Sequence, residues 1–184
     1  ELGNDNNLES HEISPKALPA FLEDKSVKLF GTLGILSERE LKARYQVDLE
    51  AYVSTLQIES RTLGDMARNH IIPTAIRYQN MLIENIRGLK EIYGSSYKDF
   101  AGEQLVILEQ ISLYISQIND GVTQMINARK KVNVITDYQN KALQYAEIVK
   151  PFLTSIRYPC DKLELTVEDT IWPLAKYREM LFVR

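Results

Sequence analysis

A single apolar stripe at helical spacing runs through this chain from residue 41 to residue 93. Its members recur three, four or seven positions apart, which places them on one face of an α-helix. They are Leu41, Tyr45, Leu49, Tyr52, Leu56, Leu63, Ala67, Ile71, Ala75, Tyr78, Leu82, Ile86, Leu89 and Tyr93. Ser37 and Glu40 form a capping box before it, and Gly94 is the residue type that commonly follows a helix. The pattern predicts one helix over residues 38–93, kinked rather than ended by Pro73.

Two further stripes predict two more long helices. One covers residues 97–132, and the other covers residues 137–169 and keeps its phase through Pro151 and Pro159, so we expect a kinked helix there. Strand candidates are short and lie within or beside helical patterns. We therefore predict an all-α fold, an antiparallel bundle of three long, kinked helices joined by short connections.

The two ends of the chain differ from the bundle. Residues 1–13 are polar and without period, which predicts a linker or frayed start. Ser14-Pro15 is a helix-start pair, so we expect a helical domain over residues 14–184 that begins with short helices. The tail, residues 170–184, holds the only tryptophan and several large apolar residues. We expect this tail to dock on another surface.

The expected helices differ in length, which leaves one stretch without a partner. The second and third helices span roughly 50 Å and can pair with residues 58–93 of the first. Residues 38–57 then overhang; residues 14–35 could cover some of their stripe, and a partner surface, either another domain or another copy of the chain, could cover the rest. The candidates for contact with another domain or another copy of the chain are Leu41, Tyr45, Leu49, Tyr52, Leu56, Trp172, Tyr177, Leu181 and Phe182.

Composition argues against several classes of protein. The chain is 45% apolar and 26% charged, as in ordinary globular proteins. Its net charge of −3 argues against binding to nucleic acid or to an acidic membrane surface. No apolar run approaches the roughly 20 residues that cross a bilayer, and one cysteine favours a reducing compartment. We therefore expect a cytoplasmic protein without a nucleic-acid or membrane partner.

A search for reactive groups finds no catalytic or ligand-binding motif. There is no Gly-rich phosphate loop and no pair of histidines or cysteines at metal spacing. Cys160 and His70 are interpreted as structural residues, and Arg129–Lys131 as cations that complement a helix C-terminus. A pair of acid–base carboxylates stays open because Asp and Glu are plentiful. We predict no catalytic, cofactor-binding or metal-ligating residue in this chain.

Two segments resemble the type III glutamine synthetases. Residues 26–78 are similar to the segment that follows the catalytic domain in that family, and Asp169–Phe182 to its extreme C-terminus. Residues 85–90 and 162–165 fit as well, especially the Bacteroides-like branch. The similar positions of the first segment are Val27, Leu29, Phe30, Glu40, Leu41, Arg44, Glu50, Tyr52, Ile58, Glu59, Asp65, Ala67, Pro73 and Tyr78.

The resemblance implies a bacterial parent enzyme of nitrogen metabolism that joins glutamate and ammonia with ATP and Mg²⁺ in a large oligomer. Its nucleotide and metal sites would lie in a catalytic domain before residue 1, and the chain itself would hold no cofactor. The chain would then be a non-catalytic C-terminal accessory domain that packs against the catalytic domain or neighbouring subunits. A regulatory, effector-binding module of the same enzyme and a free-standing helical scaffold are the alternatives.

Overall fold

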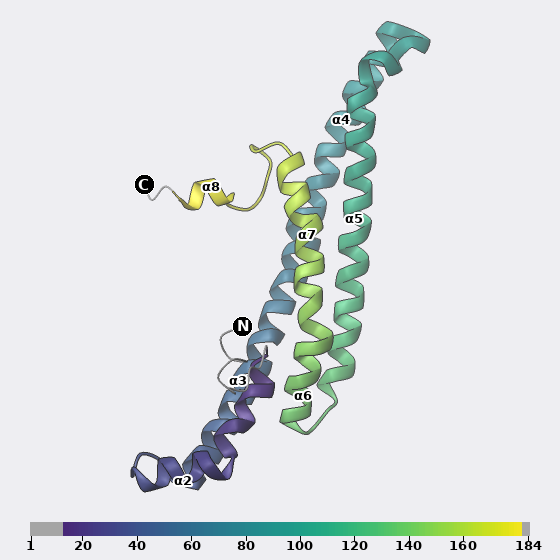
Figure 1. The fold of residues 1–184 in the computed structure, drawn as a ribbon. Helices are drawn as coiled ribbons and strands as arrows, with labels where there is room; N and C mark the ends of the chain where they lie inside the picture. The colour runs from purple at the N-terminus through teal and green to yellow at the C-terminus, as the bar shows by residue number, and fades with distance from the viewer. Residues whose placement is uncertain (1–12, 182–184) are drawn as a thin grey trace, which may run out of the picture. The chain divides into compact units, whose positions relative to one another are not determined.

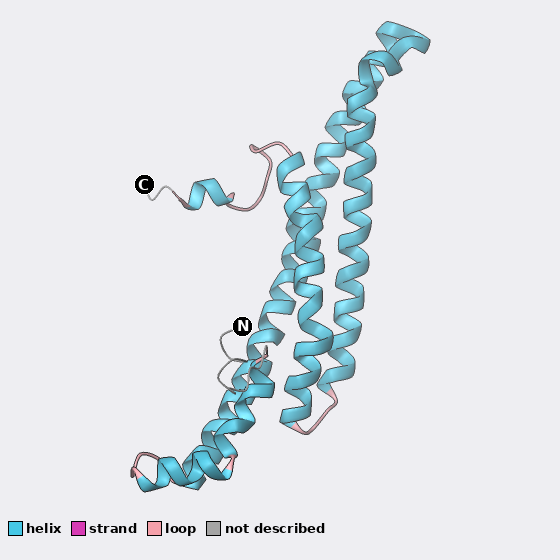
Figure 2. Ribbon diagram, in the orientation of Figure 1, coloured by secondary structure: helices cyan, strands magenta, loops and turns pink. Residues whose placement is uncertain are grey.

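A computed structural model describes residues 13–181, and every secondary-structure element in that range is a helix (Figures 1 and 2). The predicted all-α class is therefore confirmed. The chain divides into two compact units, which we describe separately. Unit 1 combines residues up to Ser60 with Ile126–Pro151, and unit 2 combines Arg61–Met125 with the residues from Phe152 onward. The predicted linker falls outside the described residues except for Ile13, and a single domain from residue 14 stays a prediction.

The first long stripe forms continuous helical structure over its predicted range. It comprises α3 (Glu38–Met66), the π-helical turn η2 (Ala67–Ile71) and α4 (Ile72–Tyr93). At its start the Ser37 backbone N–H donates to Glu40 Oε2 at 2.8 Å, and the Glu40 N–H donates to Ser37 Oγ at 3.3 Å. At its end Gly94 has a φ of 57°, a left-handed conformation that favours glycine. Both predicted boundary signals are confirmed.

The other two stripes also form helices close to their predicted ranges. A 3₁₀ turn, η3 (Gly94–Ser96), leads into α5 (Tyr97–Asn133). The third helical run comprises α6 (Tyr138–Gln144), the π-helical turn η4 (Tyr145–Val149) and α7 (Lys150–Thr166), and so ends slightly before the predicted residue 169. The shorter elements are α1 (Ser14–Ala17), η1 (Leu18–Leu22), α2 (Asp24–Thr32) and α8 (Tyr177–Met180).

A π-helical turn precedes a proline at two places in the chain. The Ile72 N–H donates to the Ala67 carbonyl, five residues back, and Pro73 follows directly. The Lys150 N–H donates to the Tyr145 carbonyl in the same way, before Pro151. Proline has no N–H and its ring crowds the carbonyl one turn earlier, and a wider turn moves that carbonyl aside. The helices continue past both prolines by this local change in hydrogen-bond register.

In unit 1 the early part of α3 is covered by the N-terminal segment. α5 ends at Asn133, whose Oδ1 accepts from Gln57 Nε2 at 2.9 Å, so residues before Gln57 extend past α5 as predicted. Leu41 is nevertheless only 2% exposed. It lines a cavity together with Phe21 and Phe30. Residues 14–35 thus cover the part of the stripe around Leu41.

In unit 2, α4 and α5 form a hairpin that extends beyond the end of α7 (Figure 1). Hydrogen bonds link Arg68 to Thr123, Gln79 to Ser112 and Asn85 to Gln104, each at 2.8 Å. Near the tip of the hairpin the rings of Tyr93 and Phe100 stack with centroids 4.0 Å apart. Because α7 ends at Thr166, large apolar side chains near this tip stay exposed, Ile92 at 74% and Phe100 at 55%.

Candidate functional site

Groups capable of metal or thiol chemistry are not assembled in the described part of the chain. Between residues 13 and 181, no three His, Cys, Asp or Glu side chains are grouped so that they could hold a metal ion. Cys160 is buried, and burial, with a smaller contribution from the charge of Asp161, raises the pKa of its thiol to about 12. A reactive thiolate is therefore disfavoured, and the interpretation of Cys160 as a buried apolar residue is confirmed. His70, interpreted as structural, lies exposed in η2.

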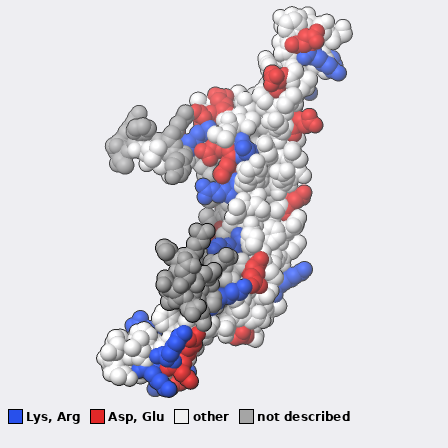
Figure 3. Space-filling model, viewed as in Figure 1, with Lys and Arg blue, Asp and Glu red and all other residues white. Residues whose placement is uncertain are grey.

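None of the helices in the described ranges is long and apolar enough to span a bilayer. On the face drawn in Figure 3, basic and acidic side chains are interspersed rather than separated into fields of one sign. Arg129–Lys131 were interpreted as cations that complement the dipole at a helix C-terminus. Lys130 and Lys131 lie in the last turn of α5, as this interpretation requires.

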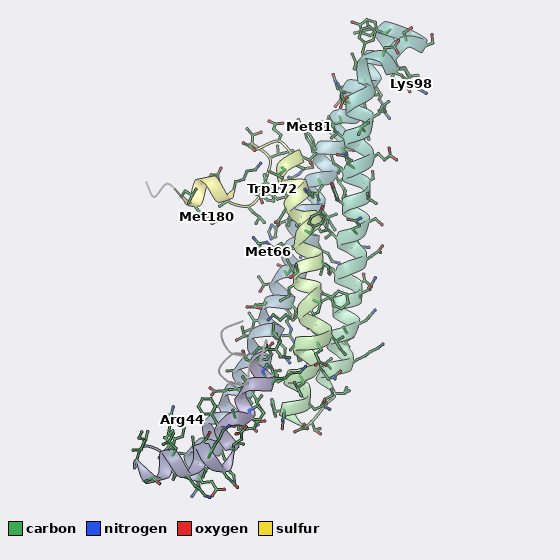
Figure 4. All side chains as sticks on the ribbon, in the orientation of Figure 1. Arg44, Met66, Met81, Lys98, Trp172 and Met180 are labelled. Carbon is green, nitrogen blue, oxygen red and sulfur yellow. The ribbon has the colours of Figure 1, made fainter. Side chains whose placement is uncertain are left out.

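The first part of the tail is fixed to unit 2 by Trp172 and Lys176. Trp172, labelled in Figure 4, is 9% exposed. Lys176 Nζ donates to the Glu164 carbonyl of α7 at 2.8 Å and also pairs with the Asp169 carboxylate. By contrast, Leu181 is 69% exposed, and Phe182 and the Tyr177 side chain lie outside what the structure describes. Of the tail candidates, Trp172 is thus engaged within the chain, whereas Leu181 presents a free apolar surface.

Trp172 also lines a cavity of about 250 Å³ in unit 2. Its walls come from the end of α3 and η2, from α7, and from the tail, with lining residues Leu63, Met66, Ile71, Arg157, Cys160, Asp161, Glu164, Trp172 and Leu174. The indole N–H of Trp172 is buried and has no hydrogen-bond partner among the described residues. An unpartnered buried donor costs about 1–3 kcal/mol. Burial of the Trp172 ring therefore leaves one hydrogen bond of its indole N–H unmade.

A second cavity, of about 180 Å³, lies in unit 1 where the N-terminal segment meets α3. It is lined by Phe21, Phe30, Leu36, Leu41, Arg44, Tyr45 and Asp48. Three of these residues carry aromatic rings, and two carry opposite charges. Burial and the negative charge of Asp137 raise the pKa of the Tyr45 hydroxyl, so its phenol stays neutral well into the alkaline range.

The remaining interface candidates lie on α3 and differ in how much surface they offer. Leu41, Leu49 and Leu56 are at most 5% exposed and offer no surface. Tyr45 and Tyr52 are half-buried. Burial and the charge of Glu59 raise the pKa of Tyr52, whose hydroxyl is buried without a partner among the described residues. Contact of these residues with another domain or subunit stays a prediction.

Sequence reasoning missed most of the exposed apolar surface. Parts of it lie on α2 and the loop after it, with Leu29, Leu33 and Ile35, and at the hairpin tip, with Ile92 and Phe100, and the most exposed large apolar residues are Leu165 in α7 and Val134 after α5. It also missed the unit 1 cavity, although Phe21 and Phe30 are the bulky apolar residues of the short N-terminal helices. Their aromatic character was the available signal, since three rings brought to one place define a ligand preference that aliphatic residues do not.

The fold places this chain among the all-α helical domains. Residues 3–90 match the glutamine synthetase C-terminal domain family. The chain is 42% identical over 171 residues to a glutamine synthetase of Bacteroides fragilis, an alignment that covers 92% of this chain and 24% of that relative. It is 28% identical over 191 residues to the type-3 glutamine synthetase of Dictyostelium discoideum, covering 100% and 25% of the two chains.

A glutamine synthetase of Butyrivibrio fibrisolvens is 24% identical over 168 residues, covering 91% of this chain and 24% of that relative. The chain is thus similar to glutamine synthetases over almost its whole length, and residues 3–90 match the C-terminal domain family of these enzymes, as its resemblance to the type III enzymes implied. It spans about a quarter of the length of the curated relatives that it matches.

Proposed function

We propose that this chain is the non-catalytic helical accessory part of a bacterial type III glutamine synthetase, an ATP-dependent glutamate–ammonia ligase. The observation that carries the proposal is its match to glutamine synthetases over 92% of its own length and only 24% of the length of the Bacteroides relative. The remaining length of such a protein is ample for a separate catalytic domain. That domain would hold ATP and Mg²⁺, and the whole enzyme would act in the cytoplasm.

The helices form an antiparallel bundle in this proposal, and their exposed apolar side chains pack against the catalytic domain or neighbouring subunits of a homo-oligomer. Antiparallel order is supported in unit 2 by hydrogen-bonded pairs in which one residue number falls as the other rises, from Arg68–Thr123 to Asn85–Gln104. Packing is supported by apolar side chains left in solvent on three separate elements, since such patches mark interaction sites. Examples are Leu33 after α2, Ile92 at the hairpin tip and Leu181 in the tail.

The test is a truncation of the full-length protein that removes residues 26–184. Oligomer mass from light scattering and the rate of ATP-dependent glutamine formation are measured on the same samples. We expect the truncated protein to lose both assembly and activity, because the surfaces that hold subunits in place are gone. Truncated protein with normal mass and a normal rate would contradict the proposal.

A regulatory role is the second candidate, and the two cavities favour it. Each is a concave, mostly apolar site with a few polar groups, the usual character of a small-molecule site. On this alternative, the truncated enzyme would assemble normally and form glutamine, but its response to feedback inhibitors would change. The same experiment therefore separates the two roles.

A further inference from the structure

The unit 1 cavity combines three aromatic rings with a carboxylate. Phe21 comes from η1, Phe30 from α2 and Tyr45 from α3, so the rings converge from three different elements. Phe30 and Tyr45 are half-buried, and Phe21 is 46% exposed. Asp48, one turn after Tyr45 on α3, is exposed and lines the same cavity. Aromatic faces carry partial negative charge, so this lining attracts positively charged groups.

The charges around the cavity include a carboxylate that can balance a bound cation. Asp48 lines it directly, and the charge of Asp137 reaches the Tyr45 hydroxyl. Arg44 is the only cationic residue of the lining (labelled in Figure 4). Arg44 and Asp48 form no ion pair with each other among the described interactions, so the carboxylate stays available.

Among the described residues, no lysine or arginine makes a cation–π contact with these rings. The cation–π contacts in the described part of the structure are made by lysines over Tyr97, Tyr138 and Tyr158. None of these rings lines the cavity. The three rings that line the cavity are therefore free of cation–π contacts with described residues.

We propose that this cavity binds a small organic ammonium ion, with the cation held by the aromatic rings and balanced by the carboxylate of Asp48. The volume of about 180 Å³ lies below the roughly 300–1,000 Å³ of sites for drug-sized ligands, so the ligand is a small one such as a trimethylammonium compound. A cation gains from the rings and from Asp48, which together outweigh the repulsion by Arg44, whereas an anion gains from Arg44 alone. The inference goes beyond the proposed packing role, because it concerns a small ligand and not a protein contact. Its test measures ligand binding and does not depend on glutamine formation.

The experiment compares choline with 3,3-dimethylbutan-1-ol, a neutral molecule of the same shape, by calorimetric titration of the full-length protein. We expect choline to bind at least about tenfold more tightly, because the ring contribution depends on positive charge. Phe30→Leu keeps an apolar wall but removes a ring, and should weaken choline binding by about tenfold. Tyr45→Phe keeps the ring and is the matched control, with affinity unchanged within about twofold.

Two charge variants provide a second readout that does not disturb the apolar lining. Asp48→Asn should weaken choline binding by about fivefold, and Arg44→Gln should strengthen it by a similar factor, since each changes one charge beside the ligand. Equal affinity for choline and its neutral analogue would overturn the proposal. So would the absence of choline binding, or affinity unchanged in both Phe30→Leu and Asp48→Asn.

Discussion

Gly121 of α5 faces Ile156 of α7 so closely that a Cβ atom placed on Gly121 would lie 2.9 Å from Ile156 Cγ1. That distance is shorter than ordinary carbon–carbon contact, about 3.5–4.0 Å. Ile156 is fully buried, and its β-branched side chain has few alternative rotamers. Glycine therefore sets how closely the two helices of unit 2 approach at this point.

Substitution of Gly121 by alanine should destabilise the chain, although alanine favours helices more than glycine does. The added methyl group would force Ile156 or the helix to shift, at a cost of about 1–3 kcal/mol. This cost is larger than the gain of up to about 1 kcal/mol in helix propensity. Urea unfolding followed by circular dichroism measures the change in the free energy of unfolding.

Gly64 provides the matched control in α3. A Cβ atom there would meet Val122 at 3.5 Å and Met125 at 3.6 Å, which is ordinary contact. Gly64→Ala should therefore stabilise the chain by up to about 1 kcal/mol. If Gly121→Ala stabilised the chain as much as Gly64→Ala does, this result would contradict the close approach of α5 and α7 at Gly121.

Cys160 should react slowly with thiol reagents in the folded chain. At pH 8 a pKa of about 12 leaves about one thiol in ten thousand ionised, against roughly one in four for an ordinary cysteine. Burial further restricts access. We expect the rate with a disulfide reagent to be at least about a thousandfold lower in native buffer than in denaturant, where the pKa returns to its ordinary value. Similar rates in the two conditions would contradict the burial of this side chain.

Substitution by alanine should destabilise the chain strongly at Trp172 and hardly at all at Leu181, although both residues lie in the tail. Trp172→Ala removes a buried ring and should cost about 3 kcal/mol of unfolding free energy in the chain. Leu181 is 69% exposed, so Leu181→Ala should change the stability of the chain by less than about 0.5 kcal/mol. If Leu181 contacts another domain, its substitution should instead reduce assembly of the full-length protein. A large loss of stability in the isolated Leu181→Ala chain would contradict its exposure.

The capping box should make stability depend on the ionisation of Glu40. Hydrogen bonds from the Ser37 backbone N–H and hydroxyl lower the pKa of this carboxyl below its ordinary value of 4.5. A lowered folded-state pKa stabilises the fold above pH 4.5, and that contribution is lost as pH falls through the lowered value.

The matching experiment compares Glu40→Gln with the unsubstituted chain across acidic and neutral pH. Glu40→Gln should be less stable at pH 7, and the difference should shrink below pH 4.5. Glu84→Gln changes an exposed carboxylate in the middle of α4 and is the control, for which we expect no comparable loss at pH 7. A difference for Glu40→Gln that stays constant from neutral to acidic pH would show that the capping carboxylate is not responsible.

Helix type and helix boundaries could be predicted from the sequence because their determinants are local. Ser37 with Glu40 marks the start of α3, and Gly94 marks the end of α4. The apolar period predicts the helical structure between them. The burial of Cys160 also followed from its place on an apolar stripe. Each of these signals depends on residues within a few turns of one another.

Features that depend on which segments meet could not be predicted in this way. Prolines 73 and 151 indicated a disturbance in the helices, but not that a π-helical turn would precede each one. The cavity of unit 1 requires Phe21 and Phe30 to meet Tyr45 across an intervening loop, and the apolar period contains no information about that meeting. Likewise, exposure of Ile92 follows from where α7 ends relative to the hairpin, which is a tertiary property.

The proposal that this chain contributes packing surfaces and not chemistry is tested most directly by its activity alone. Pure chain of residues 1–184 is incubated with glutamate, ammonia, ATP and Mg²⁺, and glutamine is measured alongside a sample of the full-length protein. We expect glutamine from the full-length protein and none from the chain alone. Measurable, ATP-dependent glutamine formation by the pure chain would contradict the account.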